Sequence, residues 1–299
     1  MKKVLITGAG SYIGTSFEIW ARDRYPGEFL IDTLDLVEEK WREKSFEGYD
    51  TVFHVAGLAH ADIGKVSVET KNFYYKINRD LAIEAAEKSK HEGVKQFVFM
   101  SSMIIYGESG GIGKHKVITG KTKPHPVNFY GDSKWQADQG VRRLQTDYFD
   151  VAVIRPPMIY GKGCKGNYTL LSKIAKTFPI FPDIKNERSM LHIDNLCEFL
   201  VLLIRNGGGG VYFPQNQEYV QTSRLVKEIS KVSGHKIWFV KRLDPIIWLA
   251  GKIPGKLSGM FHKAFGNMVY EKEMSDCFMK KYQIRTLKKS VELTEGNKN

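Results

Sequence analysis

Short apolar runs alternate with mixed polar and apolar stretches along the first half of the chain. The runs have the length and composition of buried strands and cover residues 3–7, 29–34, 51–55, 96–100 and 151–154. The stretches between several of them indicate helices over residues 15–24, 72–92 and 135–147. Strands that alternate with helices usually pair in parallel. The pattern therefore predicts an α/β fold with a doubly wound parallel sheet.

The alternation becomes less regular after residue 160, where loops, prolines and helices follow. We expect residues 1–160 to form the sheet domain and residues 161–299 to form mainly a smaller C-terminal lobe that binds substrate. Such a lobe can also thread back into the first domain. The glycine run at residues 206–210 indicates a flexible turn after a helix.

A glycine-rich segment, Gly8-Ala9-Gly10-Ser11-Tyr12-Ile13-Gly14, joins the first predicted strand to the first predicted helix. Glycines allow a tight turn and close approach of the backbone to a ligand. The N-terminus of the following helix offers N–H groups and a partial positive charge to phosphates. Strand, glycine-rich turn and helix together are typical of a dinucleotide pyrophosphate site. The alternative is a glycine turn without a ligand, and the motif described next favours the cofactor.

Tyr130 and Lys134 are four residues apart, which on a helix places them on one face, one turn from each other. A lysine ammonium beside a phenol favours the phenolate, so we expect Lys134 to lower the pKa of Tyr130. A tyrosine of this kind exchanges a proton with a sugar hydroxyl, while the hydroxyl of Ser102 holds the same oxygen. We therefore predict Ser102, Tyr130 and Lys134 as catalytic residues for hydride transfer between an alcohol and a nicotinamide.

These motifs resemble those of the extended short-chain dehydrogenase/reductases, specifically the NAD-dependent epimerase/dehydratase group that acts on nucleotide sugars. The resemblance extends over about residues 2 to 295. It is carried by residues 7–14, 50–57, 155–161 and 191–196 and by the trio of Ser102, Tyr130 and Lys134. It implies a Rossmann-type sheet domain that binds NAD. The implied cofactor-binding residues are Gly8, Ser11, Tyr12, Ile13, Gly14, Asp35, Val55, Ala56, Gly57, Tyr130, Lys134 and Pro157.

One stretch departs from the pattern of this group. Only about 16 residues separate the second predicted strand from Thr51, where a helix and another strand are usual, so one element is shortened or missing. Asp35 follows Gly14 at nearly the spacing of an acid that binds the adenosine ribose. A carboxylate there would repel a 2′-phosphate and favour NAD over NADP. Because of the short segment, Asp32 is an alternative, and a third option is that neither serves.

The resemblance implies either of two reactions. In a 4-epimerase, a sugar hydroxyl is oxidised to a 4-keto intermediate and reduced again on its other face, whereas a 4-ketoreductase performs only the reduction. Sugar 4,6-dehydratases of the group carry an Asp-Glu pair after the catalytic hydroxyl. Met103 and Ile104 stand there instead and cannot transfer a proton. We therefore expect no dehydration. No single residue decides between the epimerase and the ketoreductase, and the motif set as a whole favours the epimerase.

The resemblance also implies a substrate site for a UDP-hexose or UDP-N-acetylhexosamine of surface polysaccharide synthesis. Asn167 matches an amide near the substrate diphosphate, and Arg188 matches an arginine that pairs with phosphate. A surface salt bridge with Glu187 or Asp183 is the alternative role for Arg188. His60, just past the predicted cofactor loop, is a further candidate for sugar contact.

The net charge of +12 is concentrated after residue 224. We find no nucleic-acid motif and no stretch long and apolar enough to span a membrane. Residues 245–270 mix aromatic and basic side chains, which indicates either a helix pair on a membrane surface or, more commonly, helices packed on their own domain. A non-catalytic NAD-binding protein or a membrane-associated accessory protein would be the rival functions.

Three cysteines at wide spacing predict neither disulfides nor a metal site and indicate a reducing compartment. The N-terminus enters a strand at once, without the apolar core of a signal peptide, so we expect a cytoplasmic protein. By resemblance we expect a homodimer.

Overall fold

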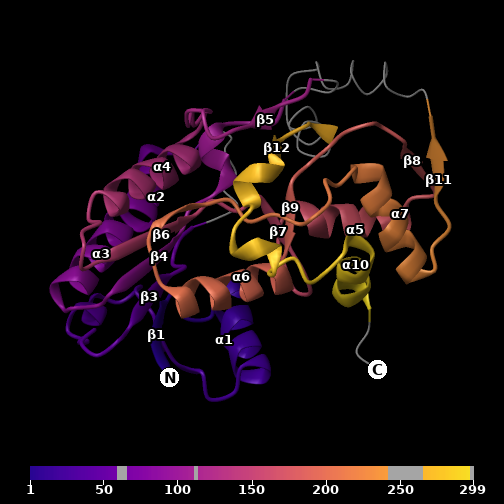
Figure 1. Cartoon of the computed structure of the whole chain (residues 1–299). Coiled ribbons are helices and arrows are strands. Elements are labelled where there is room, and N and C mark those ends of the chain that lie inside the picture. Colours follow the sequence, from indigo (N-terminus) through magenta and orange to yellow (C-terminus); the bar gives the residue numbers. More distant parts are fainter. Residues whose placement is uncertain (59–65, 111–113, 242–264, 297–299) are drawn as a thin grey trace.

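Six parallel strands form the central sheet, in the order β10-β6-β4-β3-β1-β2 (Figure 1). The computed structural model describes residues 1–58, 66–110, 114–241 and 265–296. The strands of the sheet are β1 (Lys2–Thr7), β2 (Phe29–Leu34), β3 (Thr51–His54), β4 (Gln96–Met100), β6 (Asp150–Ile154) and β10 (Gly210–Tyr212). From β1 the chain passes outward to β2 and then returns to the other side of β1 at β3. Ligands of doubly wound sheets bind at the carboxyl ends of the strands beside such a reversal.

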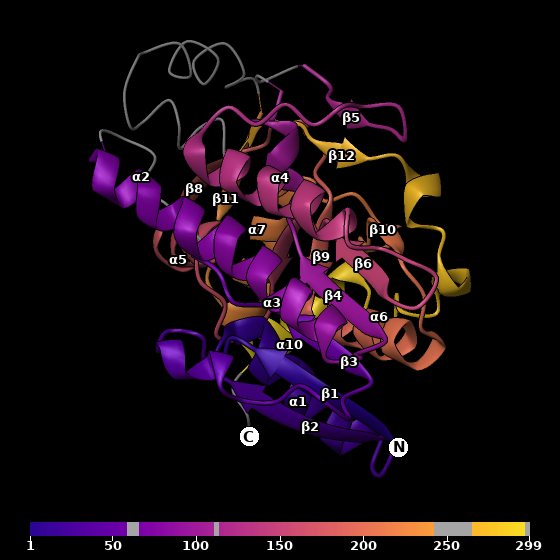
Figure 2. The same cartoon turned by 90° about the vertical axis from the view of Figure 1, so that its left-hand side faces the viewer.

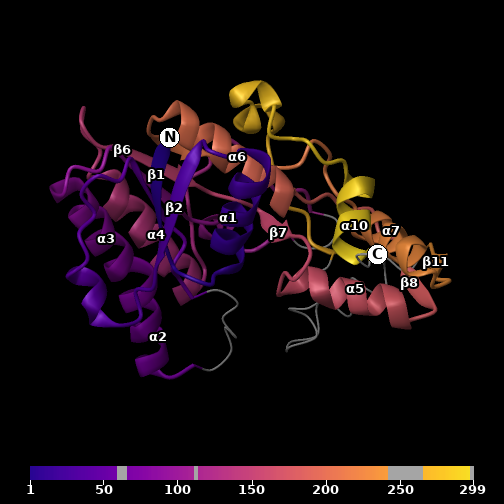
Figure 3. The ribbon, with the colours of Figure 1, turned by 90° about the horizontal axis from the view of Figure 1, so that it is seen from below.

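Helices cover both faces of this sheet (Figure 3). The α-helices are α1 (Tyr12–Arg24), α2 (Val68–Tyr75), α3 (Leu81–His91), α4 (Phe129–Arg142), α5 (Asn167–Thr177), α6 (Ile193–Asn206), α7 (Thr222–Ser233) and α10 (Leu287–Glu295). Ile6 and Phe53 face α1 and α6, whereas Leu5 and Val52 face α3 and α4. Because alternate residues of a strand enter two different cores, the strands appear in the sequence as continuous apolar runs.

The predicted strands agree with the observed ones to within one residue at each end. The predicted helix over residues 72–92 begins earlier, at Val68, and contains the π-helical segment η2 (Lys76–Asp80) between α2 and α3. Figure 2 shows α2, α3 and α4 side by side on one face of the molecule. The shortened segment between β2 and β3 contains only the 3-10 helix η1 (Glu39–Arg42) and no strand, as the spacing predicted.

The glycine run at residues 206–210 was predicted only as a turn, and this prediction was incomplete. Gly207 does end α6 with a φ of +70°, but Gly210 begins β10, which pairs with β6 at the edge of the sheet. Residues 193–212, which follow the expected boundary at residue 160, therefore return to the sheet as α6 and β10.

A second core lies beside the sheet and joins α5, α7 and α10 to short strands. The short parallel pairs are β7 (Met158–Tyr160) with β9 (Met190–His192), β8 (Ile180–Pro182) with β11 (Trp238–Val240), and β5 (Val117–Ile118) with β12 (Val269–Tyr270). The remaining 3-10 helices are η3 (Met103–Tyr106), η4 (Lys272–Ser275) and η5 (Phe278–Lys280). Of the segment predicted as a helix pair, residues 245–264 lie outside the described residues, and Phe265, Met268 and Tyr270 at its end are buried.

Candidate active site

The glycine-rich loop lies at the carboxyl end of β1, where the winding of the sheet reverses. Gly8 has a φ of +109°, and a Cβ atom there would stand 2.7 Å from the amide N of Ala56, so this position accepts only glycine. A Cβ atom on Gly14 would stand 3.0 Å from Cγ2 of Ile6, so glycine lets α1 pack closely on the sheet. Ser11 caps α1, and its hydroxyl accepts a hydrogen bond from the amide of Gly14 at 3.2 Å.

The side chains of Tyr12 and Ile13 are half-buried against the core between α1 and α6. The backbone amides at the start of α1 have no carbonyl partner within the helix and carry its positive dipole end. The tight turn, the close backbone contact and the free helix end together fit a dinucleotide pyrophosphate.

The end of β2 adjoins this loop, because the amides of Gly8 and Ala9 donate to the carbonyl of Leu34 at 2.9 and 3.3 Å. Asp35 follows at once and is exposed, with one oxygen accepting from the amide of Val37 at 2.9 Å. Asp32 instead lies within β2 and accepts from the hydroxyl of Tyr49 at 2.6 Å. Of the two candidates, Asp35 has the position suited to an adenosine ribose.

The segment after β3 runs over the side of the glycine loop. The amides of Val55 and Ala56 both donate to the carbonyl of Thr7 at 2.9 Å. A Cβ atom on Gly57 would stand 2.9 Å from Nζ of Lys134, so the backbone of the predicted cofactor segment touches the predicted catalytic lysine.

Ser102, Tyr130 and Lys134 come together where β4 meets the start of α4. Asn128 caps α4, and a Cβ atom on Gly131 would stand 3.1 Å from the carbonyl O of Ile104, so glycine allows the helix to approach η3. The hydroxyl of Ser102 lies close enough to the phenol of Tyr130 to lower its pKa, and it accepts a hydrogen bond from the amide of Ile104 at 3.2 Å. Lys134 lies one turn further along and is 7% exposed, and its Nζ donates to the carbonyl of Met100 at 3.2 Å.

Burial sets the pKa values of the two ionisable groups. It lowers the pKa of Lys134 to about 8, because the ammonium is removed from water. Burial and, to a smaller extent, the nearby Tyr74 raise the pKa of Tyr130 to about 12, whereas the hydroxyl of Ser102 opposes the rise. The expected lowering of this pKa by Lys134 is not found, because Lys134 is not among the groups that shift it and the net change is upward. The cost of burying a phenolate is the largest cause.

Asn78, within the π-helical segment, fastens the loop after β3 to α4. Its Oδ1 accepts from the amide of Leu58 at 2.8 Å, and its Nδ2 donates to the carbonyl of Leu58 and to the hydroxyl of Ser133, both at 3.2 Å. A Cβ atom on Gly57 would stand 3.0 Å from the same Oδ1, so Asn78 also borders the surroundings of Lys134. Irregular π segments are frequent at functional sites, because they redirect single side chains.

A buried ion pair lies beneath the trio and was not predicted. Asp138, one turn after Lys134, accepts from Nε and Nη2 of Arg155 at 2.9 and 2.8 Å. It also accepts from the hydroxyl of Ser101 at 2.8 Å, while Nη1 of Arg155 donates to the hydroxyl of Tyr106 at 2.7 Å. The spacing of eight residues from Tyr130 was a usable signal for Asp138, because it places both on one face of α4.

Met103 and Ile104 lie in η3, directly after Ser102. Met103 is buried and Ile104 half-buried in an apolar cluster with Tyr270, and neither offers a proton near Ser102. The amide of Met103 donates to the carbonyl of Pro156 at 2.9 Å. This contact places the buried Pro157 in the segment that adjoins η3.

Two of the predicted substrate residues, Asn167 and Arg188, lie in the second core and its loops. Asn167 is exposed at the first position of α5. Arg188 is half-buried, and burial lowers the pKa of its guanidinium to about 10. The carboxylates considered as its partners contact other groups: Asp183 accepts from Gln221 and Ser223, and Glu187 lies 3.0 Å from His115. His60 lies outside the described residues.

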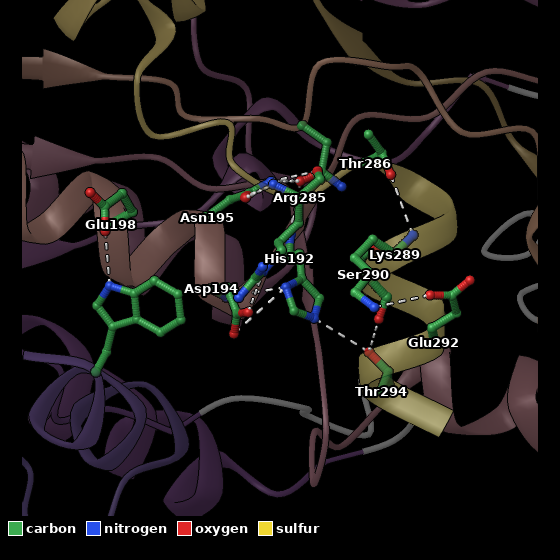
Figure 4. A network of polar contacts seen from close by, with 12 residues as sticks. His192, Asp194, Asn195, Glu198, Arg285, Thr286, Lys289, Ser290, Glu292 and Thr294 are labelled. Carbon is green, nitrogen blue, oxygen red and sulfur yellow. Dashed lines mark hydrogen bonds and ion pairs between the residues drawn. The ribbon is translucent and has the colours of Figure 1, made fainter. Parts of the chain in front are cut away.

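The segment at residues 191–196 joins α6 to the C-terminal helix (Figure 4). Asp194 pairs with Nε of Arg285 at 2.8 Å, and the side chain of Asn195 exchanges two hydrogen bonds with the backbone of the same arginine. His192 accepts from the amide of Asp194 at 3.2 Å, and its Nε2 lies 3.4 Å from the hydroxyl of Thr294. Burial lowers the pKa of His192 to about 4, so it is neutral and serves here in packing.

Across the described ranges, no three His, Cys, Asp or Glu side chains are grouped as metal ligands. Within the same ranges, each helix is too short or too polar to cross a bilayer.

Comparison with known proteins supports the geometry. Two relatives each match over 280 residues and 85% of this chain. N-acetyl-alpha-D-glucosaminyl-diphospho-ditrans,octacis-undecaprenol 4-epimerase of Escherichia coli O157:H7 is 28% identical, over 81% of its length, and UDP-glucose 4-epimerase of Vibrio cholerae is 27% identical, over 83%. The structure of UDP-glucuronic acid 4-epimerase from Bacillus cereus in complex with NAD has the same fold, with a TM-score of 0.71 at 15% identity over 98% of this chain and 95% of that one. The family model "NAD dependent epimerase/dehydratase family" matches residues 4–213. The chain belongs to the NAD-dependent epimerase/dehydratase family.

Proposed function

We propose that this protein is an NAD-dependent 4-epimerase whose substrate is a hexose or N-acetylhexosamine joined to a diphosphate, in the first instance a UDP-sugar. The proposal rests on the Ser102 hydroxyl close to the phenol of Tyr130, with Lys134 one helical turn further along α4 and the glycine loop at the point where the winding of the sheet reverses. Two relatives that are 4-epimerases over 85% of this chain support it.

In this mechanism Tyr130 takes the proton of the 4-hydroxyl and later returns it to the 4-keto oxygen. NAD held by the glycine loop would supply the hydride acceptor for the oxidation and the hydride donor for the reduction. The hydroxyl of Ser102 donates to the sugar oxygen as charge develops there. Lys134, whose Nζ donates to the carbonyl of Met100, lies one helical turn from Tyr130 and would supply positive charge to the site when it is protonated. The sugar must turn over between the two transfers so that the hydride returns to the other face.

The glycine loop with Ser11, Tyr12, Ile13 and Gly14 would hold the pyrophosphate of NAD. Asp35 would bind the adenosine ribose. The segment 55–57 and Pro157 would border the nicotinamide half. A carboxylate at position 35 disfavours a 2′-phosphate, which supports NAD over NADP.

On the substrate side, we assign Asn167 and Arg188 to the diphosphate and keep His60 as a candidate for sugar contact. The guanidinium fork of Arg188 suits a diphosphate. The names of the two relatives share a sugar on a diphosphate but differ in what the diphosphate carries, namely undecaprenol or uridine. The chemistry assigned to Asn167 and Arg188 is common to both, so both classes of substrate belong in the assay.

The deciding experiment supplies UDP-hexoses, UDP-N-acetylhexosamines and their undecaprenyl diphosphate counterparts in turn, and reads the product by NMR while nicotinamide absorbance is followed. A 4-epimer without net change in NADH supports the proposal. Stoichiometric NADH consumption with a UDP-4-keto sugar, and no epimer, would establish the 4-ketoreductase instead. Full activity of Tyr130→Phe would overturn the mechanism. The homodimer stays a prediction, which light scattering on the same preparation tests.

A further inference from the structure

Four large apolar side chains are exposed together on the outer face of the pair β8 and β11. Phe178, Ile180, Trp238 and Val240 have exposed fractions of 56%, 56%, 75% and 36%. Ile180 lies directly opposite Trp238 in the parallel register, and Phe178 precedes Ile180 by two positions in extended backbone. We call these four side chains the β8–β11 face. Figure 1 places β8 and β11 side by side at the outer edge of the second core.

The inner face of the same pair is ordinary core. Phe181 is buried, its ring lies 6.2 Å from that of Phe239, and both pack against the second core. The alternation of side chains along a strand explains why the inward phenylalanines are apolar. It does not explain the apolar residues on the outward face, where contact with water favours polar side chains. A contiguous exposed apolar patch of this kind commonly marks a surface that contacts a partner or a membrane.

The charges around the β8–β11 face are positive. Lys236 and Lys241 are exposed on either side of β11, which carries Trp238. Lys173 and Lys176 are exposed on the last turns of α5, just before Phe178, where Lys176 is paired with Glu295. Between residues 232 and 241 the chain has no Asp or Glu. In the segment 173–184 the one acid, Asp183, is half-buried and engaged by Gln221 and Ser223.

We propose that the β8–β11 face docks on an anionic lipid bilayer, with Trp238 and Ile180 inserted at the level of the headgroups and Lys236 and Lys241 against the lipid phosphates. Tryptophan favours the interface of a bilayer, and lysine reaches from an apolar surface to anionic headgroups. A second protein copy fits less well, because a stable interface needs about 20–30 residues a side and this face has four. The basic character continues in sequence into residues 242–264, which contain Lys252 and Lys256 beside Trp248 and lie outside the described residues.

The test is flotation of the purified full chain with vesicles of phosphatidylcholine, with and without phosphatidylglycerol. We expect binding only when phosphatidylglycerol is present, and weakening as salt is raised. The pair Trp238→Ser and Ile180→Ser should weaken binding roughly tenfold or more, through loss of buried apolar area. The pair Lys236→Gln and Lys241→Gln should weaken it roughly tenfold to thirtyfold. Tyr148→Ser is the matched control, because Tyr148 is 91% exposed near the start of β6 and should leave binding unchanged.

Circular dichroism and sugar turnover establish that each variant is folded. Three results would overturn the proposal: no vesicle binding by the natural chain, binding that depends on Trp248 but not on Trp238 and Ile180, or self-association in solution that Trp238→Ser abolishes. Because the vesicles contain no substrate, the outcome is independent of which sugar the enzyme converts.

Discussion

The carboxylate of Asp138 holds the guanidinium of Arg155 by two hydrogen bonds of 2.9 and 2.8 Å. This pair connects α4, which carries Tyr130 and Lys134, to the end of β6. Asp138 also accepts a hydrogen bond from the hydroxyl of Ser101, which precedes Ser102. The pair therefore connects α4 to the segment that carries Ser102 as well. One buried carboxylate thus fixes the spacing between the two segments that supply the proposed proton-transfer groups.

Removing Asp138 alone should therefore be costly. Asp138→Leu leaves the charge of Arg155 buried without its carboxylate, and we expect a loss of about 3–5 kcal/mol in the free energy of unfolding. The double variant with Arg155→Met should recover most of this loss, because neither charge is then buried. Urea denaturation of the natural protein, the two single variants and the double variant gives the coupling free energy between Asp138 and Arg155. If the losses of the two single variants simply add, the pair does not act as described.

Gly8→Ala and Gly10→Ala form a matched pair in the glycine loop. Both positions have positive φ, +109° and +72°, but only a Cβ atom at Gly8 meets backbone, whereas at Gly10 nothing lies within 4 Å. Gly10→Ala should cost about 1–2 kcal/mol of stability for the left-handed conformation and retain NAD binding. Gly8→Ala should cost more and weaken NAD binding, as measured by thermal unfolding and calorimetric titration. Equal effects of the two variants would exclude a role for the contact with Ala56.

Lys134 should be a destabilising residue in the free protein. Its pKa falls from 10.5 to about 8, and at about 1.4 kcal/mol per unit this is a cost of roughly 3 kcal/mol at neutral pH. We expect Lys134→Met to stabilise the fold by about 2 kcal/mol at pH 7, after allowance for the lost hydrogen bond to Met100.

The sign of the pH dependence follows from the lowered pKa of Lys134. Between pH 8 and 10.5 the unfolded chain binds more protons at this residue, so the natural protein gains stability as pH rises and the advantage of Lys134→Met disappears. Denaturation of both proteins at several pH values measures the difference in their stability. The Lys134→Met variant should show no turnover at any of these pH values. A variant less stable than the natural protein at pH 7 would contradict the burial cost.

Tyr130 should give an alkaline-rising rate profile. Its pKa is raised to about 12 by burial, so the fraction of phenolate, and with it kcat/KM for oxidation of the hydroxyl, should increase with pH. Because the hydroxyl of Ser102 lowers this pKa, Ser102→Ala should move the rise to higher pH. Tyr130→Phe should lower kcat by about a hundredfold to ten-thousandfold while NAD still binds. If the dependence of kcat/KM on pH is the same in Ser102→Ala as in the natural protein, Ser102 does not influence the proton transfer by Tyr130.

Much of the fold could be predicted from local sequence, and so could the place of Tyr130 and Lys134 on one helix, whereas the catalytic roles of the trio stay a prediction. The strands were predictable because both faces of each are buried, and Tyr130 with Lys134 because a helix fixes which residues share a face. Strand β10 could not be predicted, because Gly210 has no side chain and the strand exists only through its pairing with β6. The pKa of Tyr130 was predicted with the wrong sign, because the neighbouring lysine is visible in the sequence and the depth of burial is not.

The partner of Asp138 is another feature that local sequence could not predict. The place of Asp138 on the Tyr130 face of α4 follows from helical spacing, but Arg155 comes from a different strand 17 residues later. Only the sheet brings the two together. The role of Asn78 likewise depends on the π-helical segment, which no residue pattern signals.

The contacts of residues 285–290 with β7 and with the start of α6 have a consequence for how the chain is made. The hydroxyl of Tyr160 lies 2.6 Å from that of Ser290, and Arg285 pairs with Asp194. A growing polypeptide can complete the six-stranded sheet once residue 212 has left the ribosome. The second core needs α10, so it cannot be completed until residue 295 has also emerged. A truncation before Arg285 would therefore remove contacts on which the second core depends. The sheet domain could still form, but the second core could not.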